Sequence, residues 1–150
     1  MKQTPSKPAD PTETTKTEAV ATYQKYWQAM ERLYADVNAK NTDLKQYAAG
    51  AALKNAESDA KSMHDKGHVI SGQVTVGSPT VTSVDINRKI PNAKISSCLD
   101  ISHWQVIDST TKKPVALPPK RLTKYVIVST VERWPEGWRV ISDEPRGKKC

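Results

Sequence analysis

The chain of 150 residues contains no phenylalanine, only six glycines and only two cysteines. Without phenylalanine, the aromatic part of a core must come from four tryptophans and five tyrosines. No Cys-x-x-Cys pair occurs, which argues against zinc binding and thioredoxin-type chemistry. A Gly-x-Ser-x-Gly element and a glycine-rich phosphate loop are also missing, so no motif indicates a serine hydrolase or a nucleotide cofactor. We therefore expect no cofactor and no bound metal.

Long apolar runs are missing as well. No stretch approaches the ~20 apolar residues that a membrane-spanning helix requires. The first three residues lead into proline and threonine, where a signal peptide would have its apolar segment. If the protein is exported, we expect this sequence to be a mature form with an added methionine.

The chain has a surplus of positive charge. A net charge of +7 and an isoelectric point of about 9.4 favour contact with anionic surfaces such as phospholipid headgroups or acidic wall polymers. The basic residues are scattered, however, in short pairs such as Lys112-Lys113, Lys120-Arg121 and Lys148-Lys149. A solvated basic surface explains this pattern better than a nucleic-acid site does.

Residues 1–16 are rich in proline, threonine and lysine, and they cannot bury enough apolar surface to fold. We interpret them as a disordered tether and residues 17–150 as one domain. An aromatic stripe with helical spacing follows the tether: Val20, Tyr23, Trp27, Met30 and Tyr34. It predicts a helix that begins near Thr17. A short second helix is expected after the turn at 41–43, and a third over 51–66, where Gly67 ends it.

The second half of the chain has the composition of strands. Five segments are rich in valine, isoleucine and threonine: 68–76, 80–88, 92–107, 122–133 and 138–142. Turn residues such as Gly77-Ser78-Pro79 separate them. The turn at 135–137 predicts a hairpin in which Trp134 contacts Trp138 across the strands. Helices followed by strands predict an α+β fold.

The two cysteines lie far apart in the sequence. Cys98 is in a strand-like run and Cys150 is the last residue. A disulfide between them would tie the C-terminus to the sheet and would persist only in an oxidising compartment. The alternative is two unrelated thiols, one buried and one at the end of the chain.

Three motifs carry a resemblance to a known group of proteins. Ala93, Cys98 and Asp100 match a strand of the form Ala-x-Val-x-x-Cys-x-Asp. Val106, Asp108, Lys113, Pro114 and Val115 match a Val-Asp-x-x-Thr-Gly-Lys-Pro-Val hairpin, and Gly137, Trp138 and Val140 match a Gly-Gly-Trp-x-Val strand. Together with the helical segments, these motifs resemble NTF2-like (SnoaL-like, cystatin-like) proteins, and in particular small secreted proteins and lipoproteins of Gram-positive, mainly actinobacterial, type.

The resemblance implies a fold and a location. It implies a cone in which three N-terminal helices cover one curved antiparallel sheet of about five to six strands. It also implies a Cys98–Cys150 disulfide and an extracytoplasmic protein, either secreted or anchored as a lipoprotein. The tether would then follow a lipid-modified cysteine, which this chain does not contain.

The candidate catalytic residues are few. His64 and His68 have the i, i+4 spacing of a shared metal site, but Gly67 interrupts the helix that this geometry needs. Enzymes of the resembled fold place an Asp/His pair in the cone, which makes Asp100 and His103 weak candidates. Their three-residue spacing puts them on opposite faces of a strand, so Asp100 is better explained as a turn cap.

Aromatic residues are the other candidates for a site. Tyr23, Trp27, Trp104 and Trp138 are suited to line the mouth of a pocket, although core packing explains the same residues. The sequence leaves the partner open between a protein and a small ligand in the cone, with a homodimer through the sheet as a further option.

These observations favour a non-enzymatic extracytoplasmic domain that binds or scaffolds an unknown ligand. One alternative is a SnoaL-like isomerase, cyclase or dehydratase that uses Asp100 or His103. The other is an envelope component of a conjugation or secretion apparatus.

Overall fold

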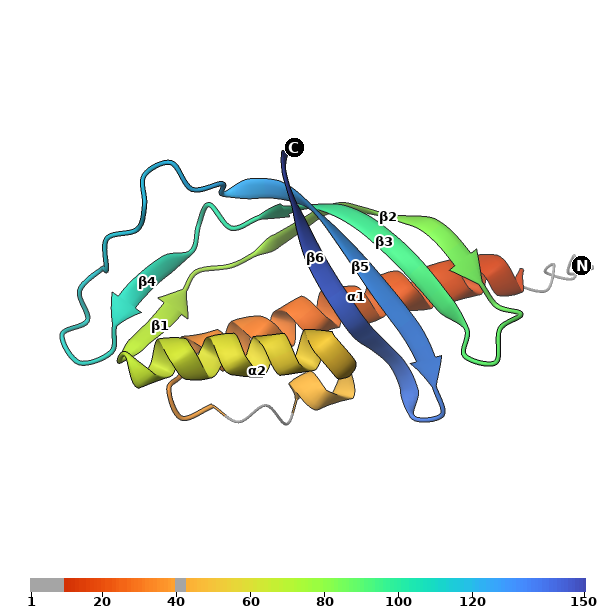
Figure 1. Cartoon of the computed structure of the whole chain (residues 1–150), viewed down its shortest axis with the longest axis horizontal. Helices are drawn as coiled ribbons and strands as arrows, with labels where there is room; N and C mark the ends of the chain where they lie inside the picture. Colours follow the sequence, from red (N-terminus) through yellow and green to blue (C-terminus); the bar gives the residue numbers. More distant parts are fainter. Residues whose placement is uncertain (1–9, 40–42) are drawn as a thin grey trace, which may run out of the picture.

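The computed structural model describes residues 10–39 and 43–150. Two helices, α1 (Pro11–Ala35) and α2 (Gly50–Asp65), flank a single 3-10 turn, η1 (Leu44–Gln46). Six strands follow: β1 (His68–Ser71), β2 (Thr75–Asp85), β3 (Asn92–Asp100), β4 (Gln105–Asp108), β5 (Lys124–Trp134) and β6 (Gly137–Lys149). They form a four-stranded antiparallel sheet in the order β2-β3-β5-β6 and a separate antiparallel pair, β1-β4 (Figure 1).

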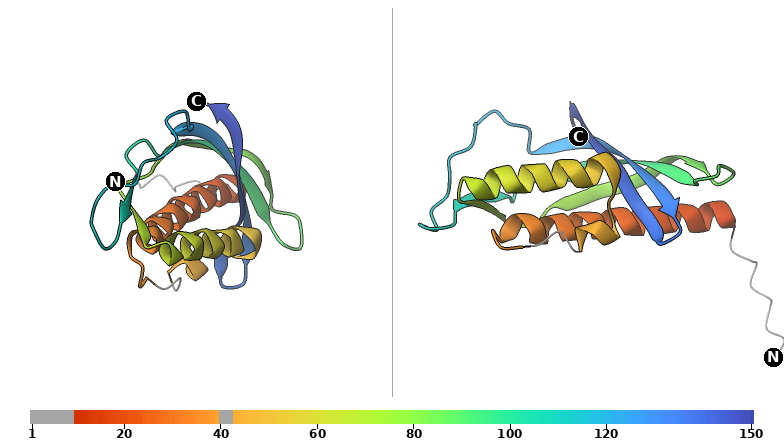
Figure 2. Two further views of the ribbon diagram at one scale, coloured as in Figure 1. Left: turned by 60° about the vertical axis from the view of Figure 1, so that its left-hand side comes forward. Right: turned by 60° about the horizontal axis from the view of Figure 1, so that its bottom comes forward.

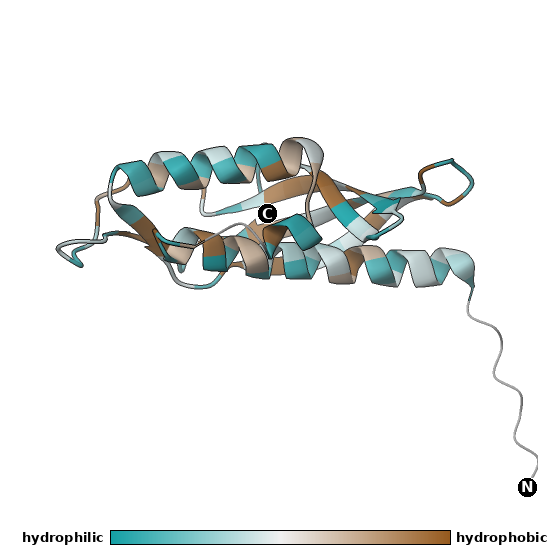
Figure 3. Ribbon diagram, turned by 90° about the horizontal axis from the view of Figure 1, so that it is seen from below, coloured by the Kyte–Doolittle hydropathy of each residue, from teal (hydrophilic) through white to brown (hydrophobic). Residues whose placement is uncertain are grey.

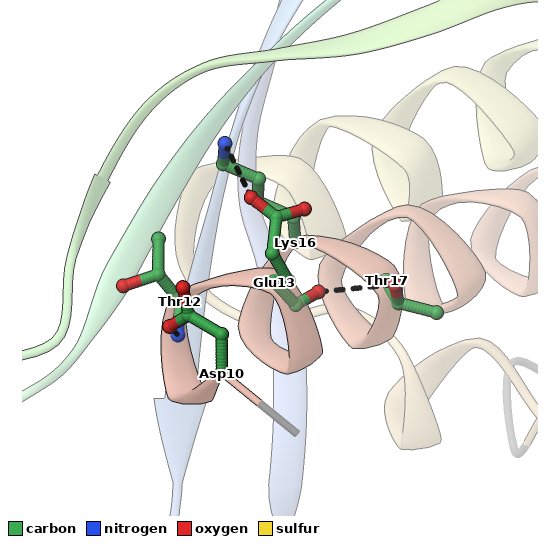
Figure 4. A network of polar contacts seen from close by, with 5 residues as sticks. All are labelled: Asp10, Thr12, Glu13, Lys16 and Thr17. Atoms are coloured by element: carbon green, nitrogen blue, oxygen red, sulfur yellow. Dashed lines mark hydrogen bonds and ion pairs between the residues drawn. The ribbon is translucent and has the colours of Figure 1, made fainter. Parts of the chain in front are cut away.

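Helix α1 begins earlier than its aromatic stripe predicts. Asp10 caps the helix by accepting a hydrogen bond from the backbone amide of Thr12 at 2.9 Å, and Pro11 occupies the first turn (Figure 4). Glu13 adds an ion pair with Lys16 at 3.2 Å. The helix therefore occupies the last six residues of the segment predicted to be a tether, while residues 1–9 lie outside the described part of the chain.

The expected arrangement of three helices on one sheet is wrong in the number of helices and in the number of sheets. The predicted second helix is only the three-residue turn η1, because a segment this short cannot form the hydrogen bonds that offset helix nucleation. The predicted single sheet is two sheets, because the strands expected at 68–76 and 92–107 are both interrupted.

The two interruptions lie opposite each other. β1 leads into β2 through residues 72–74, and β3 leads into β4 through residues 101–104. Gly72, at φ +97°, lies directly against the carbonyl of His103, where a Cβ atom would collide with it. The close approach of the two backbones thus needs a glycine, and it separates the β1-β4 pair from the main sheet.

Both helices cover the concave side of the four-stranded sheet, which arches over them (Figure 2). Alternate residues of β3 point inward and are buried, among them Ala93, Ile95 and Leu99. They meet the aromatic face of α1, where Tyr23 is fully buried. Seen from below, both helices alternate between hydrophilic and hydrophobic residues, and hydrophobic strand segments lie between them (Figure 3).

Candidate functional site

A cavity of about 580 Å³ lies between the two helices and the concave face of the sheet. The side of α2 that faces the sheet presents small residues, Ala52 and Ala56, so this helix fills little of the space beneath the sheet. The remaining walls are mostly aromatic and aliphatic: Tyr26, Trp27, Met30, Tyr34, Ile70, Trp104, Tyr125 and Ile127. Both the volume and the lining are typical of a small-molecule pocket.

Asp143 of β6 places a carboxyl group among these largely apolar walls. Its Oδ1 accepts hydrogen bonds from the hydroxyls of Ser129 at 2.7 Å and Tyr23 at 3.0 Å. Burial disfavours the carboxylate and raises the pKa of Asp143 to about 6, although the hydrogen bonds from Ser129 and Tyr23 oppose this rise. The carboxyl group is therefore mostly ionised at neutral pH, and hydroxyls are its hydrogen-bond donors.

An extra residue in β6 turns Asp143 toward the cavity. Val140 pairs with Val131, but the next pair is Ser142 with Thr130, so Ile141 is a bulge. Because side chains alternate along a strand, one inserted residue exchanges the two faces for everything after it. Asp143 consequently lies opposite Ser129 on the inner face of the sheet.

Four tyrosines respond to the charge on Asp143. Burial raises the pKa of Tyr23, Tyr26, Tyr34 and Tyr125, and the negative charge of Asp143 raises each of them further. All four are thus neutral phenols at physiological pH.

The aromatic side chains of the cavity contact one another. The rings of Tyr26 and Trp27 lie 5.6 Å apart in an edge-to-face arrangement. Trp104, from the segment between β3 and β4, reaches Trp27 at 6.1 Å and Tyr34 at 6.0 Å. These contacts tie the β1-β4 end of the molecule to α1 and keep the rings at one wall of the cavity.

The four aromatic residues proposed from the sequence lie in different places. Trp27 and Trp104 line the cavity, whereas Tyr23 is buried beside it and holds Asp143. Trp138 lies away from this cavity and donates a hydrogen bond from Nε1 to Glu18 at 2.9 Å. Its predicted contact with Trp134 is not compatible with the register, because Trp138 pairs with Arg133 and Trp134 therefore faces the other side of the sheet.

The candidate acid and histidine residues lie outside the cavity. Asp100 accepts a hydrogen bond from the backbone amide of Ser102 at 2.9 Å, and the hydrogen bonds from Ser102 lower the pKa of Asp100. His103 is exposed in the same turn. His64 and His68 do not share a helix, since α2 ends at Asp65.

No cluster of three or more metal-ligating side chains occurs within residues 10–39 and 43–150. Within the same ranges, no helix is long and apolar enough to cross a membrane.

The predicted disulfide is confirmed: Cys98 of β3 is bonded to Cys150, with Cα atoms 5.8 Å apart. Ser97 and Leu99 are buried on the inner face, so Cys98 lies on the outer face of the sheet. The bond carries the end of β6 across β5 to β3. It therefore fixes the part of β6 that supplies Asp143 to the cavity, and it is the type of bond found in proteins outside the cytoplasm.

Comparison with known proteins identifies a structural neighbour but no family. No family model matches the sequence, and no curated protein matches it. Among solved structures, the intermembrane space region of the chloroplast protein ARC6 superposes with a TM-score of 0.57 at 13% sequence identity. The match covers 92% of this chain and 98% of that structure. The two proteins thus share a fold.

The sequence did not identify Asp143 as a candidate. The last predicted strand ended at residue 142, so the bulge that turns Asp143 inward had no signal in the alternation pattern. Tyr26 and Tyr34 were recognised as parts of an amphipathic helix, but their role as cavity walls depends on the small residues of α2, which are distant in the sequence.

Proposed function

We propose that the protein is a non-enzymatic, extracytoplasmic domain that binds a small molecule between its two helices and its four-stranded sheet. The observation that carries this proposal is the cavity of about 580 Å³, which has aromatic walls and a single inward carboxyl group on the sheet. A cavity of this kind combines apolar area for affinity with a few polar groups for orientation.

The disulfide supports the extracytoplasmic part of the proposal. The bond to Cys98 holds the C-terminal part of β6, and Asp143 and Pro145 in that strand line the cavity. The shared fold with the ARC6 region, which is described as an intermembrane space region, agrees with a domain that works outside the cytoplasm. A lipid anchor and membership of the secreted NTF2-like proteins remain predictions from the sequence.

Filling the cavity tests the proposal. Ala56→Phe places a ring in the cavity from α2, whereas Ala51→Phe adds the same ring to an exposed position on the same helix. A mixture of indole, p-cresol and benzyl alcohol is titrated into each ¹⁵N-labelled protein and followed by amide chemical shifts. Wild type and Ala51→Phe should show saturable shifts around Ala52 and Ile127, and Ala56→Phe should not. Saturable shifts that persist in Ala56→Phe would contradict binding in this cavity.

A second candidate function is proton transfer, which the pKa of Asp143 near 6 favours. In this alternative, Asp143 has the role that was expected of Asp100 or His103. Exchange of deuterium into the α-carbon of cyclohexanone, compared between wild type and Asp143→Asn, separates the two functions. A binding domain should give the same exchange rate in both proteins, and an enzyme should give a slower rate in the variant.

A further inference from the structure

The charge on the cavity walls differs in sign from the charge of the whole protein. The chain carries +7, yet the titratable side chains at this cavity are Tyr26 and Tyr34 of α1, Asp59 of α2, Tyr125 of β5 and Asp143 of β6. Lysine, arginine and histidine are absent from the described residues that line it. The cavity is therefore an acidic, aromatic site within a basic molecule.

The depth of the two carboxyl groups is different. Asp143 lies on the floor of the cavity with hydroxyl groups of Ser129 and Tyr23 as donors. Asp59 is exposed, and its charge raises the pKa of Tyr34. Asp59 therefore lies near the rim of the cavity, beside Tyr34. A buried carboxylate without a cationic partner destabilises the protein, and a cation that entered the cavity would remove this cost.

The two indole side chains of the cavity present rings rather than hydrogen-bond donors, whereas the tyrosines of the same walls carry hydroxyl groups. The Nε1 atoms of Trp27 and Trp104 are enclosed by protein and have no partner within the described residues, so a ligand in the cavity meets the carbon atoms of the indoles. Tyr34 stands at 88° to Trp104, so neighbouring walls of the cavity are set at right angles. The negative faces of aromatic rings attract cations, and tryptophan does so most strongly.

A metal ion does not suit this site. Hard cations need several oxygen ligands, and the described residues contain no cluster of three metal-ligating side chains. A cation with apolar substituents fits both the carboxylate and the rings.

We propose that the cavity binds an organic ammonium ion, with its nitrogen facing Asp143 and its substituents against Trp27, Trp104 and Tyr34. This inference rests on the proposed function, because it names the class of ligand for the same cavity. Selectivity comes from the carboxylate and affinity from the rings.

Two probes of equal shape test the proposal. Benzyltrimethylammonium and neopentylbenzene differ only in the charged nitrogen that replaces a carbon. Each is titrated at pH 7.5 into wild type, Asp143→Asn and Asp100→Asn, with amide chemical shifts as the readout. Asp100→Asn is the matched control, since it removes one negative charge outside the cavity and keeps an oxygen acceptor for the amide of Ser102.

We expect the ammonium ion to bind at least tenfold more weakly to Asp143→Asn than to wild type, with neopentylbenzene unchanged. Asp100→Asn should bind both probes as wild type does. Binding of both probes that does not depend on Asp143 would overturn the ammonium proposal and leave the cavity as a neutral small-molecule site. If neither probe shifts the cavity resonances, both the ammonium proposal and the proposed function are overturned.

Discussion

The carboxyl group of Asp143 should make the protein less stable as the pH rises, whereas most carboxyl groups make a protein more stable as the pH rises. Replacement of Asp143 by asparagine should remove this loss of stability. In the folded protein the pKa of Asp143 rises from 3.8 to about 6, because burial favours the neutral acid. The folded state therefore holds an extra proton between these two values, and stability falls as the pH rises through this window. The asparagine variant does not titrate, and its side-chain oxygen can still accept hydrogen bonds from Ser129 and Tyr23.

The size of the effect follows from the two pKa values. A pKa difference from 3.8 to about 6 corresponds to at most about 3 kcal/mol of unfolding free energy, at about 1.36 kcal/mol for each tenfold change. Solvent in the cavity reduces this value. Near pH 3 wild type and variant should have similar stability, and near pH 8 the variant should be more stable by up to about 3 kcal/mol.

Urea unfolding followed by tryptophan fluorescence at several pH values from 3 to 8 measures this difference. Asp100→Asn is the control with the opposite sign, because the pKa of Asp100 is lowered in the folded state and its charge favours folding at neutral pH. Parallel pH curves for wild type and Asp143→Asn would refute the argument that Asp143 is a buried, destabilising carboxylate.

Two further predictions concern the covalent and backbone geometry. Replacing Cys98 and Cys150 by alanine opens a loop whose ends are 52 residues apart in the sequence. It should lower the unfolding free energy measured in urea by about 4 kcal/mol. An unchanged unfolding free energy would show that the loop is already ordered in the unfolded state. Gly72→Ala should destabilise the protein by about 3 kcal/mol, since the new Cβ collides with the carbonyl of His103. Gly147→Ala also has positive φ but meets nothing within 4 Å, so it should cost only about 1 kcal/mol, and equal losses in the two variants would contradict the collision.

Local signals in the sequence predicted the elements better than their arrangement. The aromatic stripe predicted most of α1, and the turn at 135–137 predicted the β5-β6 hairpin, which the pairing of Trp134 with Gly137 confirms. Asp10-Pro11 was also a readable start signal, but the Thr/Pro-rich composition around it indicated disorder. The division into two sheets depends on the approach of Gly72 to His103, a contact between distant residues that no local pattern contains.

The candidate site was less predictable than the fold, for a reason that one strand illustrates. If the alternation of Trp138 and Val140 continued along β6, residue 142 would face the core and Asp143 would face solvent, where carboxylates are common. The bulge at Ile141 reverses this assignment. It buries a carboxylate whose hydrogen-bond donors, among the residues that the structure describes, are hydroxyl groups, and this burial destabilises the fold. An apolar residue at position 143 would make the protein more stable. The cost is therefore best explained by what Asp143 does inside the cavity, and the charge-matched probes measure that role independently of folding.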